Sequence, residues 1–338
     1  MISNMLGRCA VASLALLAAT VAAAAEPVTL KLAFFGSDRS STYLAAIKPF
    51  VDAVNAEGKG LVEIQPYLSG TLGKEIAQQP QIVLDGKADL AFIVPGYTPE
   101  LFPDNTVLEL PGLFRNGTDA TRVYTRLIAE RALMGYRDFV VIGAYESEPE
   151  TFHGRVSITS LQDIKGRRIR VNNAGETVAL ERLGAIPVPL QITAVSEALS
   201  SDAIDATLMA RTPLADYGIS RVATHHFLLT TSGAPLALVM NRKVFEGLPP
   251  AAQAIIQKYS GTYAAERFAE LYAATDQKVM AQLRADPKRQ IATPTTSEIK
   301  WADTVFKAVR AELASRDPHR QALLQAVENE LGMLGPSD

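Results

Sequence analysis

The sequence has 338 residues, of which 48% are hydrophobic and 20% charged, and its formal net charge is -3. This length suits about two domains with a sizeable core, and the charge argues against a nucleic-acid-binding protein, which usually has a strongly basic face. The single cysteine excludes an internal disulfide.

Residues 1–25 predict a cleavable signal peptide. Arg8 precedes an apolar run, residues 9–25, that ends in three alanines. This run is rather short and alanine-rich for a membrane span, so we expect cleavage after Ala25 rather than an uncleaved anchor. Arg8 directly before Cys9 does not fit a lipid-attachment site. We therefore expect a soluble, cysteine-free periplasmic protein.

The first part of the mature chain alternates strands and helices. Residues 28–35, 61–68 and 88–95 read as strands with helices between them. This order is typical of a parallel sheet covered by helices. Ligands of such sheets bind at the carboxyl ends of the strands. The candidate contacts there are Ser37, Ser69, Thr71 and Tyr97.

The alternation resumes after residue 138, so the predicted fold class is α/β with two lobes. The further strands are 139–146, 167–171, 185–190, 203–209 and 234–241. One long helix is predicted from Pro249-Pro250 to just before Pro287, long enough to span both lobes, and a final helix carries residues 299–313.

No long linker is visible, so the chain is expected to cross between the lobes several times, with a ligand in the cleft between them. The predicted division puts residues 26–148 and about 234–270 in lobe I. Residues 149–233 and about 271–338 form lobe II.

Catalytic motifs are not found. The sequence has no G-x-S-x-G, H-E-x-x-H or Walker-type loop. The adjacent His225 and His226 would point to opposite faces of a strand, which is wrong for joint metal binding, and His153 reads as structural. We therefore expect no enzyme activity, no metal and no cofactor.

Three glutamates share one face if their segment is extended. Glu146, Glu148 and Glu150 alternate along the chain. A solvated acidic edge is the favoured interpretation, and a calcium or acid–base site is the alternative.

A cluster of cations occupies residues 165–170. Lys165, Arg167 and Arg168 are interpreted as solvated charges. Arg170 lies in a predicted strand that ends in Asn172 and Asn173. Arginine suits a carboxylate because its planar group donates two parallel hydrogen bonds.

Several segments resemble those of a known family. SITSLQDIKGRRIRV (157–171) resembles the segment that contains the ligand-binding arginine in the substrate-binding subunits of tripartite ATP-independent periplasmic (TRAP) transporters, the DctP type. Further resemblances follow in the family's order: LSGTLG, LDGKADLAFI, LELPGLFRN, LGAIPVPL, AIDATLM and ALVMNRKVFEGLPPAAQAII. They cover nearly all of residues 28–285, and the ordered set is specific.

The resemblance implies two α/β lobes that close on a small organic acid, with a long helix spanning both. It also implies that Arg170 pairs with the ligand carboxylate. Many members have a second arginine about twenty residues earlier, where this chain has Glu150 or Thr151.

A second departure follows Asp205-Ala206. Many members continue with Gln-Glu-Asn-Pro, whereas this chain has residues 207–210 and then Arg211. Arg211 either replaces some of the missing polarity or forms a surface salt bridge beside Asp216. These departures point away from sugar acids and toward a less polar or differently shaped carboxylate.

The predicted ligand contacts combine one anchoring arginine with polar groups at strand ends and apolar walls. They are Arg170, Asn172, Met209, Arg211, Tyr97, Ser37, Ser69, Thr71, Phe152 and Ser232.

The predicted function is that of a periplasmic solute-binding protein. It captures a small carboxylate in the interlobe cleft and delivers it to the integral membrane subunits of a TRAP-type transporter. The alternatives are a ligand sensor of the same fold that presents its closed form to a receptor, and a secreted enzyme acting on an acidic substrate. We expect a monomer that binds no nucleic acid.

Overall fold

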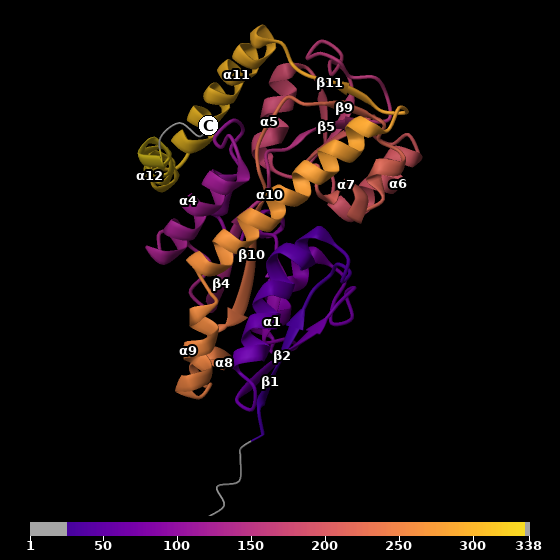
Figure 1. The fold of residues 1–338 in the computed structure, drawn as a ribbon. Helices are drawn as coiled ribbons and strands as arrows, with labels where there is room; N and C mark the ends of the chain where they lie inside the picture. Colours follow the sequence, from indigo (N-terminus) through magenta and orange to yellow (C-terminus); the bar gives the residue numbers. More distant parts are fainter. Residues whose placement is uncertain (1–25, 335–338) are drawn as a thin grey trace, which may run out of the picture.

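The computed structural model describes residues 26–334, which form two sheets with helices packed against them (Figure 1). The predicted signal peptide, residues 1–25, lies outside the described part. No helix within residues 26–334 is both long and apolar enough to span a membrane. The two-lobe α/β prediction is confirmed.

The first sheet has the strand order β2-β1-β3-β10-β4. β1 pairs in parallel with β2 and β3, as the alternation predicts, whereas β10 runs antiparallel between β3 and β4. The strands are β1 (Val28–Ala33), β2 (Val62–Tyr67), β3 (Leu90–Ile93), β4 (Phe139–Glu146) and β10 (Pro235–Asn241).

The second sheet has the order β11-β9-β5-β8-β6-β7. β6 is parallel to β7 and β8, and β5 is antiparallel to β8 and β9. The strands are β5 (Thr151–Gly154), β6 (Arg168–Val171), β7 (Ile186–Pro189), β8 (Ala206–Met209), β9 (His225–Phe227) and β11 (Gln290–Ala292).

Helices lie on both faces of these sheets and supply most of the remaining core. The α-helices up to residue 258 are α1 (Lys48–Glu57), α2 (Gln79–Leu84), α3 (Asn105–Leu108), α4 (Gly117–Ala129), α5 (Ala174–Leu183), α6 (Val195–Ser200), α7 (Pro213–Asp216), α8 (Arg242–Glu246) and α9 (Pro250–Lys258). Short π and 3-10 turns are η1 (Tyr43–Ile47), η2 (Ile76–Gln78), η3 (Pro95–Tyr97), η4 (Ile192–Ala194) and η5 (Ile219–Arg221).

The long helix begins later than predicted. α10 (Thr262–Ala285) is separated from α9 by residues 259–261, and the φ of 62° and ψ of -126° at Gly261 leave the helical region. Glycine adopts such a positive φ without steric cost, so the expected single helix is two. α10 still spans both lobes, since it packs on η1 and β4 at one end and places Leu283 in the second lobe's core at the other (Figure 1).

The last two helices are α11 (Thr296–Ser315) and α12 (Pro318–Leu334). α11 packs on α5 of the second lobe, but α12 returns to α3 and α4. Its Leu323, Leu324 and Val327 join the core of the first lobe. We keep the lobe division as a proposal, with α12 moved from lobe II to lobe I.

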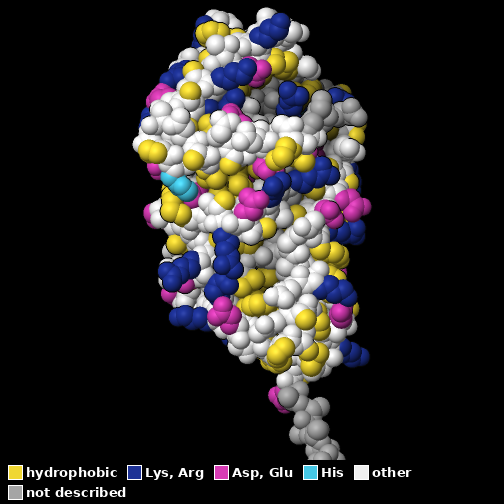
Figure 2. Space-filling view, turned by 90° about the vertical axis from the view of Figure 1, so that its left-hand side faces the viewer, with side chains coloured by type: hydrophobic (Ala, Val, Ile, Leu, Met, Phe, Trp, Pro, Cys, Tyr) yellow, Lys and Arg dark blue, Asp and Glu magenta, His cyan; other side chains and the backbone are white. Residues whose placement is uncertain are grey.

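Two segments cross between the lobes side by side. One joins β4 to β5 and the other leads into β10. Backbone hydrogen bonds link them: Glu150 N donates to Ser232 O at 2.7 Å, and Thr231 N donates to Glu150 O at 2.9 Å. Figure 2 shows basic and acidic side chains interspersed on the face turned toward the viewer, rather than a single basic patch.

Candidate functional site

A cavity lies between the lobes, beside the two crossing segments. It is lined from the first sheet by the ends of β3 and β10, and from the second by β6 and β8. Its volume is about 80 Å³, several times what a single water needs. Its polar and charged lining residues include Thr42, Tyr97, Glu109, Ser147, Glu150, Arg170 and Asn172.

Arg170 is the only buried lysine or arginine in residues 26–334, with 1% of its surface exposed. Its Nε donates to Leu190 O and its Nη1 to Leu208 O, both at 2.8 Å. Its Nη2 donates to Tyr97 Oη at 3.1 Å. A guanidinium carries five N–H donors, so one on each terminal nitrogen remains for a carboxylate.

Tyr97 joins the two lobes at this point. It follows β3 in the first lobe, yet its hydroxyl oxygen accepts hydrogen bonds from Arg170 and from the backbone N–H of Ile192 in the second, at 3.1 and 3.2 Å. Its own O–H proton is then left for another acceptor. Arg170 and Tyr97 together therefore present donors from both lobes.

Glu150 lies on the β4-to-β5 crossing. Its Oε1 accepts a hydrogen bond from Asn172 Nδ2 at 2.5 Å, and its buried Oε2 has no hydrogen-bond partner within residues 26–334. Burial and the neighbouring Glu176 raise its pKa well above the usual value, although Arg170 opposes the shift. The segment interpreted as a solvated acidic edge is thus buried at Glu146 and Glu150.

Most of the remaining cavity wall is apolar. Aromatic rings come from both lobes, and aliphatic side chains fill the space between them. The larger members are Phe35, Phe92, Ile192, Met209, Tyr217 and Tyr272. Such a wall suits a ligand with an apolar body better than a sugar ring with a hydroxyl on each carbon.

Four of the ten predicted contacts line the cavity: Tyr97, Arg170, Asn172 and Met209. Phe152 does not, because its ring lies in the second lobe's core against Phe227. Ser69 and Thr71 are exposed beyond β2, and the Thr71 hydroxyl donates back to Leu68 O.

Two further predicted contacts stand just outside the lining. Ser37 belongs to a local turn in which its Oγ accepts from Arg39 N. Ser232 is buried behind the cavity, where its Oγ donates to Glu176 Oε1 at 2.8 Å. Ser232 therefore supports the cavity wall instead of facing its interior.

Arg211 forms a salt bridge, but not with Asp216. Its Nε and Nη2 donate to the two carboxylate oxygens of Asp276 in α10, at 3.1 and 2.5 Å. Asp216 instead accepts from Ser41 N at 2.9 Å. Arg211 thus ties the end of β8 to the helix that spans the lobes, and it does not line the cavity.

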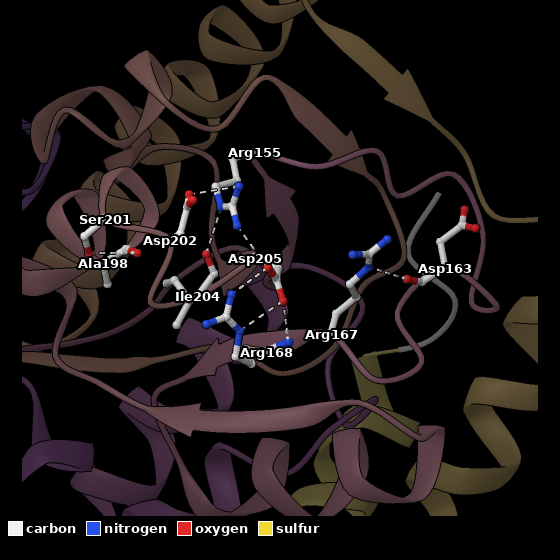
Figure 3. A network of polar contacts seen from close by, with 9 residues as sticks. All are labelled: Arg155, Asp163, Arg167, Arg168, Ala198, Ser201, Asp202, Ile204 and Asp205. Carbon is white, nitrogen blue, oxygen red and sulfur yellow. Dashed lines mark hydrogen bonds and ion pairs between the residues drawn. The ribbon is translucent and has the colours of Figure 1, made fainter.

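Other arginines of the basic segment serve the fold (Figure 3). Arg168 Nη2 donates to Asp205 Oδ1 at 3.0 Å and its backbone N–H to Oδ2 at 2.9 Å. Arg155 reaches the same carboxylate at 3.2 Å. Arg168 is therefore part of an ion-pair network between β6 and β8, whereas Arg167 donates only to Asp163 O, at 3.4 Å.

Replacing Asp205 with asparagine is expected to lower the free energy of unfolding by about 1–3 kcal/mol at pH 7, because charge-assisted hydrogen bonds are lost. Burial would raise the pKa of Asp205, but the hydrogen bonds from Arg168 hold it below its usual value. This stabilisation is present above the unfolded pKa of about 3.9 and disappears as the pH falls below it. Urea unfolding of both proteins at pH 7 and pH 3 measures the difference; an equal loss at both values would contradict the assignment.

Glu109 was not among the predicted contacts. It lies between Leu108 and Leu110, directly after α3, and 4% of its surface is exposed. Burial raises its pKa to about 8, and the nearby Glu176 adds to the rise. An ionisable residue inside the apolar run LELPGLF was the signal that could have identified it.

A family model described as "Bacterial extracellular solute-binding protein, family 7" (DctP) matches residues 33–317. The chain is 24% identical to the 2,3-diketo-L-gulonate-binding periplasmic protein YiaO of Escherichia coli strain K12. That match spans 304 residues, which is 89% of this chain and 91% of YiaO.

Two solved structures share the fold over almost the whole chain. A TRAP solute-binding protein from Rhodoferax ferrireducens T118, in complex with copurified benzoate, superposes with a TM-score of 0.82 at 25% identity, covering 90% of this chain and 98% of that one. A marine metagenome TRAP solute-binding protein specific for aromatic acid ligands, in complex with 3-hydroxybenzoate, gives 0.84 at 21% identity, covering 92% and 100%.

Proposed function

The chain belongs to the DctP family of bacterial extracellular solute-binding proteins, and we propose that it binds a small organic acid through Arg170 and delivers it to a TRAP-type transporter. Its relatives include periplasmic binding proteins for 2,3-diketo-L-gulonate and for C4-dicarboxylates. A periplasmic location after removal of residues 1–25, and a monomeric state, belong to the same proposal.

The observation that carries the proposal is the buried guanidinium of Arg170 at a cavity between two lobes. Burying a cation is costly unless it is paired. Three backbone and hydroxyl acceptors orient this one without neutralising it. A ligand carboxylate supplies the missing charge and accepts two parallel hydrogen bonds.

Ligand binding is coupled to lobe closure because the contacts come from both lobes. Tyr97 belongs to the first lobe and Arg170 to the second, and a carboxylate between them would accept from both. A ligand shifts the balance between open and closed forms only by its difference in affinity for them. Contacts on both sides of the cleft supply that difference, and the closed form is what a transporter recognises.

The ligand body is proposed to be aromatic or otherwise apolar. Phe35 and Phe92 face it from the first lobe, and Ile192 and Tyr217 from the second. The benzoate-bound Rhodoferax protein is a relative of similar shape. A uronic acid would leave several ring hydroxyls against these side chains without partners, which disfavours it.

Thermal unfolding with a panel of organic acids tests the proposal. Benzoate, 3-hydroxybenzoate and phenylacetate are expected to raise the Tm more than glucuronate or succinate. A ligand at a hundredfold excess over its Kd stabilises the native state by about 2.7 kcal/mol. If no carboxylate of any shape raises the Tm, the proposed function is wrong.

Membership of this family favours delivery to a transporter over the receptor-coupled sensor. The secreted enzyme is likewise not favoured, since the residues around Arg170 include no nucleophile paired with a base. Within residues 26–334, no group of His, Cys, Asp and Glu side chains is arranged to hold a metal ion. Co-purification with the integral membrane subunits, in the presence of ligand, would test the transporter partner.

A further inference from the structure

Four buried glutamates gather where the chain crosses between the lobes. Glu109, Glu146, Glu150 and Glu176 are at most 4% exposed. They come from the end of α3, the end of β4, the crossing segment and the first turn of α5. Arg170 is the only buried lysine or arginine of the described chain, so buried acidic groups outnumber buried basic ones at the cavity.

Glu109 faces the cavity without a partner. No described residue donates a hydrogen bond to its carboxylate, and the carboxylate contributes to the cavity wall. A Cβ at position 96 would lie 1.9 Å from Glu109 Oε1. The Glu109 carboxylate fits beside the cavity because residue 96 is a glycine. Any side chain at position 96 would displace it.

Glu150 is the other carboxyl group that lines the cavity, but its oxygen atoms are not open to a ligand. Asn172 donates to its Oε1, and its Oε2 is enclosed by protein atoms. Glu176 is also occupied, because Thr231 and Ser232 donate to its Oε1. Glu109 is thus the lining carboxyl group whose oxygen atoms are free for a ligand.

We propose that the ligand carries a protonated nitrogen as well as its carboxylate, and that Glu109 binds this nitrogen while Arg170 binds the carboxylate. An ammonium has three donors and no acceptor, which matches a carboxyl group with free oxygens. A ligand without a donor at this point would fill the cavity and leave the Glu109 oxygens buried without a partner. The inference rests on the proposed function and adds a second recognition group to it.

The protonation of Glu109 gives the proposal a pH signature. The titratable groups that face Glu109 are Tyr97, Tyr124, Glu146 and Glu176. With its pKa raised to about 8, Glu109 is mostly protonated at pH 6 and must release a proton to a cationic ligand. Affinity for such a ligand is therefore expected to rise by about tenfold or more between pH 6 and pH 8.

Matched ligands of one shape provide the test. Calorimetry would compare 2-, 3- and 4-(aminomethyl)benzoate with the hydroxymethyl and ethyl analogues, and 5-aminopentanoate with 5-hydroxypentanoate and hexanoate. The best amine is expected to bind at least about tenfold more tightly than its own analogues, a difference of 1.4 kcal/mol. If a hydroxyl or alkyl analogue binds as tightly as the amine, the inference is wrong but the proposed function stands. If neither these acids nor any acid of the thermal panel binds, the proposed function itself fails.

Glu109→Gln provides a variant that preserves shape. It removes the ionisable group, so the preference for the amine over its analogues should fall by about tenfold. The pH dependence of amine affinity should be lost as well. Affinity for the ethyl analogue should not fall. Glu63→Gln, an exposed position on β2, is the matched control and should leave the preference unchanged. Circular dichroism of both variants checks the fold; a preserved amine preference in folded Glu109→Gln would overturn the inference.

Discussion

Replacing Arg170 with methionine is expected to weaken organic-acid binding by a hundredfold to a thousandfold. Truncating one partner of a buried, hydrogen-bonded charge pair costs about 2–5 kcal/mol. The methionine side chain keeps much of the volume but none of the donors. Calorimetry with the best acid from the thermal panel measures the loss.

The same substitution affects the apo protein, because Arg170 also donates to Leu190 O and Leu208 O. Arg170→Lys therefore accompanies it. Lysine keeps the charge but cannot form the planar pair of hydrogen bonds, so it should recover part of the affinity. A folded Arg170→Met protein that binds with unchanged affinity would contradict the assignment of Arg170 as the carboxylate anchor.

Arg168 is the matched control, two residues away on the same strand. Its guanidinium pairs with Asp205 away from the cavity. Arg168→Met should lower stability, since the network in Figure 3 is broken, yet it should leave the ligand Kd unchanged. The pair of variants separates a loss of binding from a loss of fold.

Strand alternation alone could not distinguish these two arginines. In an extended strand Arg168 and Arg170 share a face, and both are adjacent to apolar residues. The family resemblance singled out Arg170, and the structure explains the difference: Arg168 is at the start of β6, where Asp205 is within reach, and Arg170 is inside the sheet. Partners from other strands, which periodicity does not reveal, determine each role.

Local patterns predicted the elements better than the site. Residues 28–95 alternate as expected, but Ser69 and Thr71 follow β2 into an exposed turn that does not line the cavity. Glu109 reaches the cavity because α3 packs against η3 and because position 96 has no side chain. The sequence pattern also did not predict the break at Gly261, since apolar residues keep helical spacing on both sides of it.

The histidines make a contact that the sequence did not predict. His225 and His226 do point to opposite sides, but His226 faces His153 from the neighbouring antiparallel strand. Their Nδ1 atoms are 2.7 Å apart. The two residues are 73 positions apart in the chain, so only the register of β5 and β9 brings them together.

The surroundings of this pair determine its protonation. Arg289 Nη1 is 3.4 Å from His226 Nε2, which must therefore be the acceptor. His226 Nδ1–H then donates to His153 Nδ1, and His153 Nε2–H to Met209 O at 3.2 Å. Both rings are neutral in this arrangement. A proton added to either ring would have no hydrogen-bond acceptor. It would also lie beside the positive charge of Arg289 or Arg211.

Acid is therefore expected to destabilise the protein through these histidines. Burial and Arg289 lower the pKa of His226 to about 4, and burial with His226 holds that of His153 well below its usual value. Their stabilisation is present above the unfolded pKa of about 6.5 and is lost as the pH falls toward the folded values. Between pH 7.5 and pH 5 the loss is about 2 kcal/mol for His226, and His153 adds to it.

The buried glutamates change stability in the opposite direction, because their raised pKa values favour the folded state at low pH. The wild-type pH profile alone therefore mixes two effects, and a difference measurement separates them. The double variant His153→Asn, His226→Asn keeps polar atoms near the Nδ1 positions but does not titrate. Chemical unfolding at pH 7.5 and pH 5 should show the wild type losing at least about 2 kcal/mol more than this variant. An identical pH dependence in the two proteins would mean that the histidines are not held neutral in the folded state.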